Sequence, residues 1–141
     1  MGDQLVVMQF DEAGEPGADL PVDVVLGRLR EVFGDDPELD LPIEDGDVVE
    51  LEFTGARASI DGFVYAGAQG VQRVVVEIAD RSWGEPVHEF RQEVTPALDA
   101  LVALARDTGA RFFDSVDPRS ASLTTEQALD LLAPTDPPRA G

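Results

Sequence analysis

The first half of the chain alternates short apolar runs with polar, glycine-containing connections. Residues 4–10 are apolar along most of their length and predict a first strand, and a loop rich in glycine, proline and acids follows to Gly17. Apolar residues then recur at helical spacing, which predicts a helix that Asp19 caps and Gly34 ends. The apolar stripe of this helix consists of Val25, Leu26, Leu29, Val32 and Phe33.

Residues 48–79 carry the patterns of strands and tight turns. Asp45-Gly46 is a turn signal, and apolar and polar side chains then alternate, as in a strand with one face in water. The apolar set is Val49, Leu51 and Phe53, and the polar set is Glu50, Glu52 and Thr54. Asp61-Gly62 and residues 67–70 separate further strand-like runs and are interpreted as hairpin turns. The whole segment therefore predicts an antiparallel meander.

The segment that follows the meander contains a strong helix signal. Thr95 and Pro96 are typical of an N-cap and a first helical position, and an apolar stripe extends from there to Gly109, which is expected to end the helix. The preceding residues, 86–94, fit either a helix or an edge strand.

The end of the chain predicts one more strand and one more helix. Residues 111–116 read as a short strand, and Thr124 with Gln127 forms the capping-box pattern that opens a helix. We therefore expect one α+β domain over residues 1–133, a mainly antiparallel sheet of about five strands packed against two or three helices. Residues 134–141 have nothing to bury and are predicted to be a disordered tail.

Composition narrows the classes of function. The chain holds 29 acidic residues against ten basic ones, all arginine, for a net charge of −19. Nucleic acids and anionic membranes are bound through clustered cations, so this balance argues against both and favours a basic protein partner. The absence of cysteine and of any long apolar run fits a soluble, cytoplasmic protein.

The acids concentrate in residues 35–52, which contain no arginine. The members are Asp35, Asp36, Glu38, Asp40, Glu44, Asp45, Asp47, Glu50 and Glu52. Such a run is either a solubilising face or an interface that steers an oppositely charged partner, and both interpretations stay open. Trp83 lies in a loop punctuated by glycine and proline, where it serves either as core packing or as an interface anchor.

Patterns for catalysis and metal binding are incomplete. His88 is the only histidine and there is no cysteine, so neither a structural nor a typical catalytic zinc site can be assembled. Asp45 and Asp47 resemble a carboxylate pair that holds Mg²⁺, but they precede a strand instead of following one. The chain has no lysine for a Walker A loop. We expect no cofactor, no metal and no enzymatic activity, with a carboxylate enzyme that binds a cation as the remaining catalytic alternative.

Residues 98–114, LDALVALARDTGARFFD, combine a helix rich in alanine and leucine, a glycine stop and a strand that ends in aspartate. This segment resembles one found in immunity proteins of bacterial polymorphic toxin systems. The resemblance implies a cytoplasmic protein that binds a secreted toxin domain, often a basic one when the toxin acts on nucleic acid, and blocks its active site. It assigns no functional residue.

Two binding hypotheses follow. In the first, residues 35–52 dock on the cationic cleft of a toxin and Trp83 anchors the complex. The alternative is an acidic secretion chaperone or adaptor, which predicts a dimer that holds an extended segment of a client protein.

Overall fold

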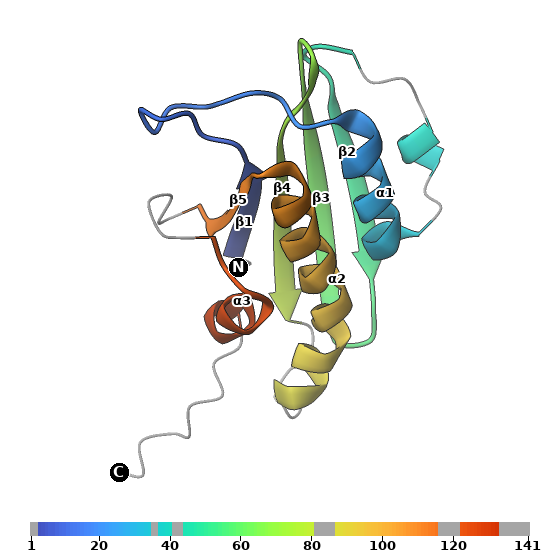
Figure 1. Ribbon diagram of the computed structural model, residues 1–141. Coiled ribbons are helices and arrows are strands. Elements are labelled where there is room, and N and C mark those ends of the chain that lie inside the picture. Colours follow the sequence, from blue (N-terminus) through green and yellow to red (C-terminus); the bar gives the residue numbers. More distant parts are fainter. Residues whose placement is uncertain (1–2, 35–36, 41–43, 81–86, 116–121, 133–141) are drawn as a thin grey trace.

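A five-stranded sheet carries helices on one face in the computed structural model (Figure 1), which describes residues 3–34, 37–40, 44–80, 87–115 and 122–132. The strands are β1 (Asp3–Met8), β2 (Val48–Thr54), β3 (Ala58–Gly67), β4 (Gly70–Asp80) and β5 (Arg111–Asp114). The α-helices are α1 (Val22–Phe33), α2 (Val87–Thr108) and α3 (Thr125–Leu132), and Pro37–Asp40 forms a short 3₁₀ helix, η1. The predicted α+β fold is confirmed. The predicted tail, residues 134–141, lies outside the described residues.

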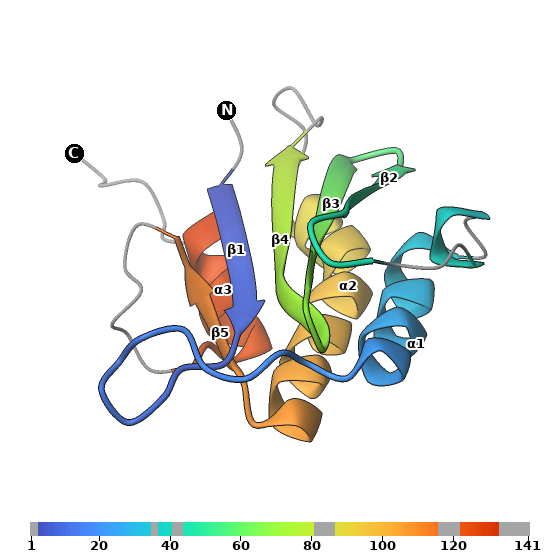
Figure 2. The same cartoon turned by 90° about the horizontal axis from the view of Figure 1, so that it is seen from above.

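The strand order is β2-β3-β4-β1-β5, and every neighbouring pair is antiparallel. The predicted meander is present as β2, β3 and β4, with a tight turn between Gly67 and Gly70. The first strand then joins the far side of β4 and the short β5 closes the row (Figure 2).

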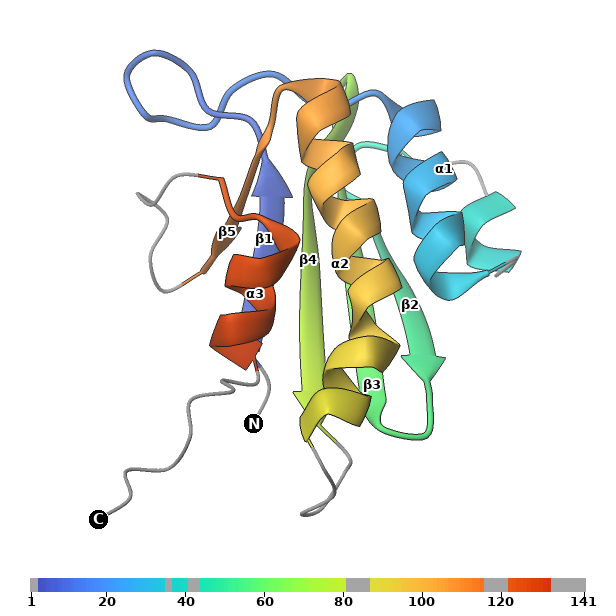
Figure 3. The same ribbon diagram turned by 60° about the horizontal axis from the view of Figure 1, so that its bottom comes forward.

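The main hydrophobic core lies between the sheet and the helices, all of which stand in front of the strands in Figure 3. Leu98, Leu101 and Leu104 of α2 are almost completely buried, and so are Val25 and Leu29 of α1. Burial of each leucine contributes roughly 1.5–3 kcal/mol relative to exposure, which explains why the helices share one side of the sheet.

Asp61-Gly62 is not a turn, contrary to the sequence interpretation. The third strand runs straight through both residues, and Gly62 pairs with Leu51 on one side and Val76 on the other. The β2–β3 turn lies earlier, where the Gly55 N–H donates to the Ala58 carbonyl at 2.8 Å.

The start of α2 also differs from the prediction. Residues 87–94 are helical, so Thr95 and Pro96 lie inside the helix instead of capping it. The Thr95 hydroxyl donates to the Arg91 carbonyl at 2.6 Å. Phe90 and Val94 continue the buried stripe upstream, and their burial outweighs the backbone hydrogen bond that proline cannot make.

Three predicted helix ends are confirmed. Gly34 ends α1 with a φ of 73°, and Gly109 follows the end of α2 with a φ of 71°. The capping box of α3 is also confirmed, because the Gln127 N–H donates to the Thr124 hydroxyl at 3.1 Å and the Thr124 N–H donates to the Gln127 side chain at 3.0 Å. Asp19, however, does not cap α1. Its carboxylate accepts the Gln69 N–H in the β3–β4 turn at 2.8 Å.

Candidate protein-binding face

The sheet face opposite the helices, here called the open face, bears a second apolar cluster. Among the described residues no helix covers this face, which Figure 2 presents in front of the helices. Val6, Met8, Val75 and Phe113 form the buried part of the cluster. An antiparallel sheet with one covered face normally alternates apolar and polar side chains. Here β1 and the middle of β4 are apolar on both faces, so the open face is not an ordinary solvated surface.

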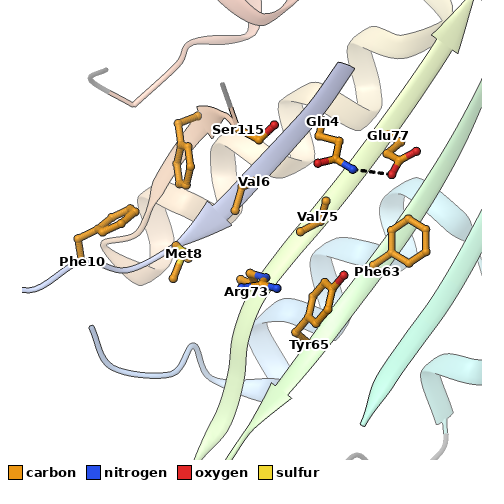
Figure 4. Close-up of a pocket in the computed structure, with 11 residues that line it drawn as sticks. Gln4, Val6, Met8, Phe10, Phe63, Tyr65, Arg73, Val75, Glu77 and Ser115 are labelled. Atoms are coloured by element: carbon orange, nitrogen blue, oxygen red, sulfur yellow. Dashed lines mark hydrogen bonds between the residues drawn. The ribbon is translucent and has the colours of Figure 1, made fainter. Parts of the chain in front are cut away.

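Aromatic side chains form the outer layer of this cluster. Phe10, Phe63 and Tyr65 are partly buried and pack over the smaller apolar residues. They border a hollow of about 420 Å³ on the open face, which Phe63 and Tyr65 of β3 line together with Val75 of β4 (Figure 4). A partner that fills this hollow would bury aromatic area that is now partly in water.

Strand register arranges the open face in rows that cross the sheet. One row, here called the apolar row, pairs Phe63 with Val75, Val75 with Val6 and Val6 with Phe113. It spans four strands, and Glu50 of β2 continues it at the fifth.

The adjacent row is acidic. Glu52 pairs with Asp61 across β2 and β3, and Asp61 pairs with Glu77 across β3 and β4; these three residues are here called the acidic row. Gln4 comes next and donates its side-chain N–H to Glu77 at 2.7 Å. Like charges directly opposite one another on neighbouring strands destabilise a sheet. The row therefore costs stability in the isolated protein.

The two arginines of the open face in the described part of the chain lie over aromatic rings. The guanidinium carbon of Arg73 is 4.2 Å from the ring centre of Tyr65, and that of Arg111 is 4.6 Å from the ring centre of Phe10. Among the described residues, no arginine forms an ion pair with the acidic row.

Arg28, Arg57 and Arg91 on the helix side, in contrast, have acidic partners. Arg28 donates to Asp107 at 2.7 Å, and this hydrogen bond raises the pKa of the arginine above its ordinary value. Arg57 pairs with Glu89 at 2.7 Å, and Arg91 lies within 4 Å of two acids on α3. These ion pairs balance charge on the helix side, whereas the acidic row has no arginine partner among the described residues.

Part of the predicted acidic run belongs to this face. Glu50 and Glu52 are exposed on β2 and point to the open side, as the alternating pattern predicts. The turn that precedes β2 is exposed. An internal hydrogen bond closes it, in which the Asp47 carboxylate accepts the Glu44 N–H at 2.9 Å. Asp45 is also exposed in that turn.

Other predicted residues are not placed. Asp35, Asp36 and Trp83 lie outside the described residues, and of Glu38 and Asp40 only the backbone, in η1, is described.

Sequence reasoning missed Asp61, Glu77 and the aromatic residues of the open face. The Asp61-Gly62 pair predicts a turn, and Glu77 lies within the mainly apolar residues 74–79. One usable signal was the continuous apolar character of residues 5–8 and 74–76, which is typical of strands buried on both faces.

The acidic row does not form a metal site. Within the described part of the chain, no three histidine, cysteine or acidic side chains are grouped so that they could hold a metal ion.

The described helices include none that is long and apolar enough to cross a membrane. No family model, no curated protein and no solved structure matches the chain.

Proposed function

We propose that the protein binds a basic protein through the open face and neutralises it, as an immunity protein neutralises its toxin. The observation that carries this proposal is the acidic row beside the apolar row, on a sheet face that the described helices leave uncovered. Interfaces commonly combine a buried apolar centre with a polar rim, and the two rows supply both parts.

The two rows have different roles in the proposed complex. Glu52, Asp61 and Glu77 attract a cationic surface at long range and so raise the association rate. Phe63 and Tyr65 contact the partner group that fills the hollow and slow dissociation, because buried aromatic residues dominate interface energies. The carboxylates that repel one another in the free protein gain cationic neighbours in the complex.

Neutralisation follows from the chemistry of the partner. A toxin domain that cleaves or modifies nucleic acid needs a cationic cleft for the phosphate backbone. A protein that presents a row of carboxylates to such a cleft occupies the site of the phosphates and excludes the substrate.

The test begins with the protein encoded by the neighbouring open reading frame. We expect a basic domain that forms a one-to-one complex with this protein. Its toxicity or enzymatic activity is then measured with and without this protein. Absence of a complex, or a complex in which the toxin stays fully active, contradicts the proposal. A homodimer that holds an extended, unfolded client indicates the chaperone function instead.

A further inference from the structure

We infer that the outer edge of β2 receives an extended basic segment of the partner as a sixth strand. The inference rests on the proposed function, because it assigns a particular docking mode to the same basic partner. Its own basis is the backbone of β2, which ends the sheet on one side (Figure 3).

Register fixes which backbone groups of β2 point outward. Gly55 N–H donates to the Ala58 carbonyl at 2.8 Å, and Ala66 N–H donates to the Asp47 carbonyl at 2.9 Å, so both ends of the β2–β3 ladder are known. Antiparallel partners alternate between bonded and non-bonded pairs. Every second residue, Val49, Leu51 and Phe53, therefore bonds to β3, and the N–H and carbonyl groups of Val48, Glu50, Glu52 and Thr54 face away from the sheet.

These outward groups form an open docking edge. No backbone hydrogen bond from the described part of the chain reaches any of the four residues on their outer side. The 3₁₀ helix η1 contacts β2, but its Leu39 is buried in the main core, which places η1 on the helix side of the sheet. An exposed edge of this length is a template for pairing with another chain.

The opposite edge of the sheet is partly occupied within the chain. The Phe112 N–H donates to the Ser122 hydroxyl at 3.0 Å, and the Leu123 N–H donates to the Phe112 carbonyl at 2.7 Å. The outward backbone groups of Phe112 are thus satisfied within the chain, whereas no described residue bonds to the four outward residues of β2.

A second copy of this chain is a poor occupant. Every antiparallel register that pairs three or more of the four outward residues sets a glutamate, Glu50 or Glu52, directly opposite another glutamate. Like charges in that position destabilise the pair, and the net charge of −19 opposes association of two copies as well.

Charge complementarity selects the occupant. A strand added beside β2 places one side chain opposite Glu50 and one opposite Glu52 on the open face, and arginine or lysine fits both positions. The residue between them faces the helix side next to buried Leu51, where an aliphatic side chain fits. The preferred segment therefore alternates basic and aliphatic residues.

The experiment uses the full chain and a blocked peptide of alternating arginine and valine, with a peptide of the same composition but contiguous arginines as control. Amide hydrogen exchange is followed by NMR. We expect the Glu50 and Glu52 amides to exchange about tenfold more slowly at about 90% occupancy by the alternating peptide, since only the free fraction exchanges. The Val49, Leu51 and Phe53 amides, which already bond to β3, should change little.

Matched variants separate backbone pairing from charge. Glu52→Pro and Glu52→Ala both remove the carboxylate, but only proline removes the outward N–H, and an edge strand tolerates proline there. We expect the alternating peptide to bind the proline variant about fivefold more weakly than the alanine variant. Equal affinities overturn the inference, and the exchange measurement on the unmodified chain decides the matter if the proline variant does not fold.

The failures are distinguishable. Suppose that the neighbouring basic protein binds and shifts the NMR signals of Phe63 and Tyr65 while neither it nor the peptide slows exchange of the Glu50 and Glu52 amides. In that case strand addition is wrong and the proposed function stands. If neither the protein nor the peptide binds, both are wrong. Equal protection by the two peptides would show that strand pairing does not select the alternating pattern, which overturns the segment assigned to this edge.

Discussion

The ring of Phe33, the last residue of α1, lies against the backbone of Gly62 in the middle of β3. A Cβ atom at position 62 would be 2.7 Å from Cζ of that ring, closer than real side chains approach. The glycine therefore lets the ring lie directly against the strand, and a side chain at position 62 would force the ring or the strand to shift.

Gly62→Ala tests this contact. We expect the free energy of unfolding to fall by about 1–3 kcal/mol, since the added methyl group forces the ring or the strand to shift. Urea unfolding measures the change. Gly27→Ala is the matched control, because Gly27 is exposed on α1 with no atom within 4 Å of the added Cβ. That variant should gain about 0.5–1 kcal/mol through helix propensity, and a similar loss in both variants would contradict the packing argument.

Glu93 of α2 holds the β2–β3 turn. One of its carboxylate oxygens accepts the N–H groups of Arg57 and Ala58 at 2.9 and 2.7 Å. Glu93→Gln weakens both charge-assisted bonds, and we expect a loss of about 1–2 kcal/mol in urea unfolding. Glu126→Gln is the control, since its side chain is 78% exposed and its ion pair is loose. It should change stability by less than about 0.5 kcal/mol, and equal losses would argue against a special role for Glu93.

The acidic row predicts a gain in stability when one charge is removed. Asp61 has an acid opposite it on each side, so Asp61→Asn should raise the free energy of unfolding by roughly 0.2–1 kcal/mol at low salt. The gain should shrink at high salt, where surface charges are screened. A loss of stability at low salt would show that the carboxylate makes favourable contacts that outweigh the repulsion.

Neutralising the open face should slow association with the basic partner. For the triple variant Glu50→Gln, Glu52→Gln and Asp61→Asn, we expect an association rate roughly tenfold lower at low salt and a weaker dependence on salt. Stopped-flow fluorescence or surface plasmon resonance gives both quantities.

A matched triple variant removes three charges from the exposed helix side. It carries Asp23→Asn, Asp99→Asn and Glu126→Gln, so its net charge equals that of the open-face variant. We expect a much smaller change in its association rate. If the two variants slow association equally, the effect belongs to net charge and the open face has no special part in it.

Phe63 should govern how long the complex lasts. Phe63→Ala removes the aromatic group that belongs to the apolar row and also borders the acidic residues of β2. We expect dissociation to become about 30-fold faster, the effect of losing an anchor worth roughly 2 kcal/mol. Leu131→Ala is the control, because Leu131 is 44% exposed on α3. Its dissociation rate should match that of the unmodified protein, and a slow-dissociating Phe63→Ala complex would place the anchor elsewhere.

Features that depend on near neighbours in the sequence were predictable. The alternation along β2 and the capping box of Thr124 and Gln127 are examples, because the residues that decide them lie within a few positions of one another. The outward direction of Glu50 and Glu52 followed from the same alternation.

Features that depend on distant residues were not. The Asp61-Gly62 pair predicts a turn, but Gly62 lies inside a strand and makes room there for Phe33, which is distant in the sequence. Thr95 and Pro96 have the pattern of a helix start, yet α2 begins upstream of them, at Val87. Phe90 and Val94 are buried in the core, and this tertiary burial outweighs the local signal. The acidic row exists only once β2, β3 and β4 are in register, so no linear pattern reveals it.

The partly occupied edge at β5 also limits how large an assembly can become. A sheet with two open edges can add strands at both ends and grow into a fibre, as edge-to-edge aggregation does. Ser122 and Leu123 already form hydrogen bonds with the outward N–H and carbonyl of Phe112. A further strand therefore cannot bond to Phe112 at this edge of the sheet. If a strand adds at β2 as proposed, we expect one partner segment for each copy of the protein, because Phe112 at the other edge already bonds within the chain.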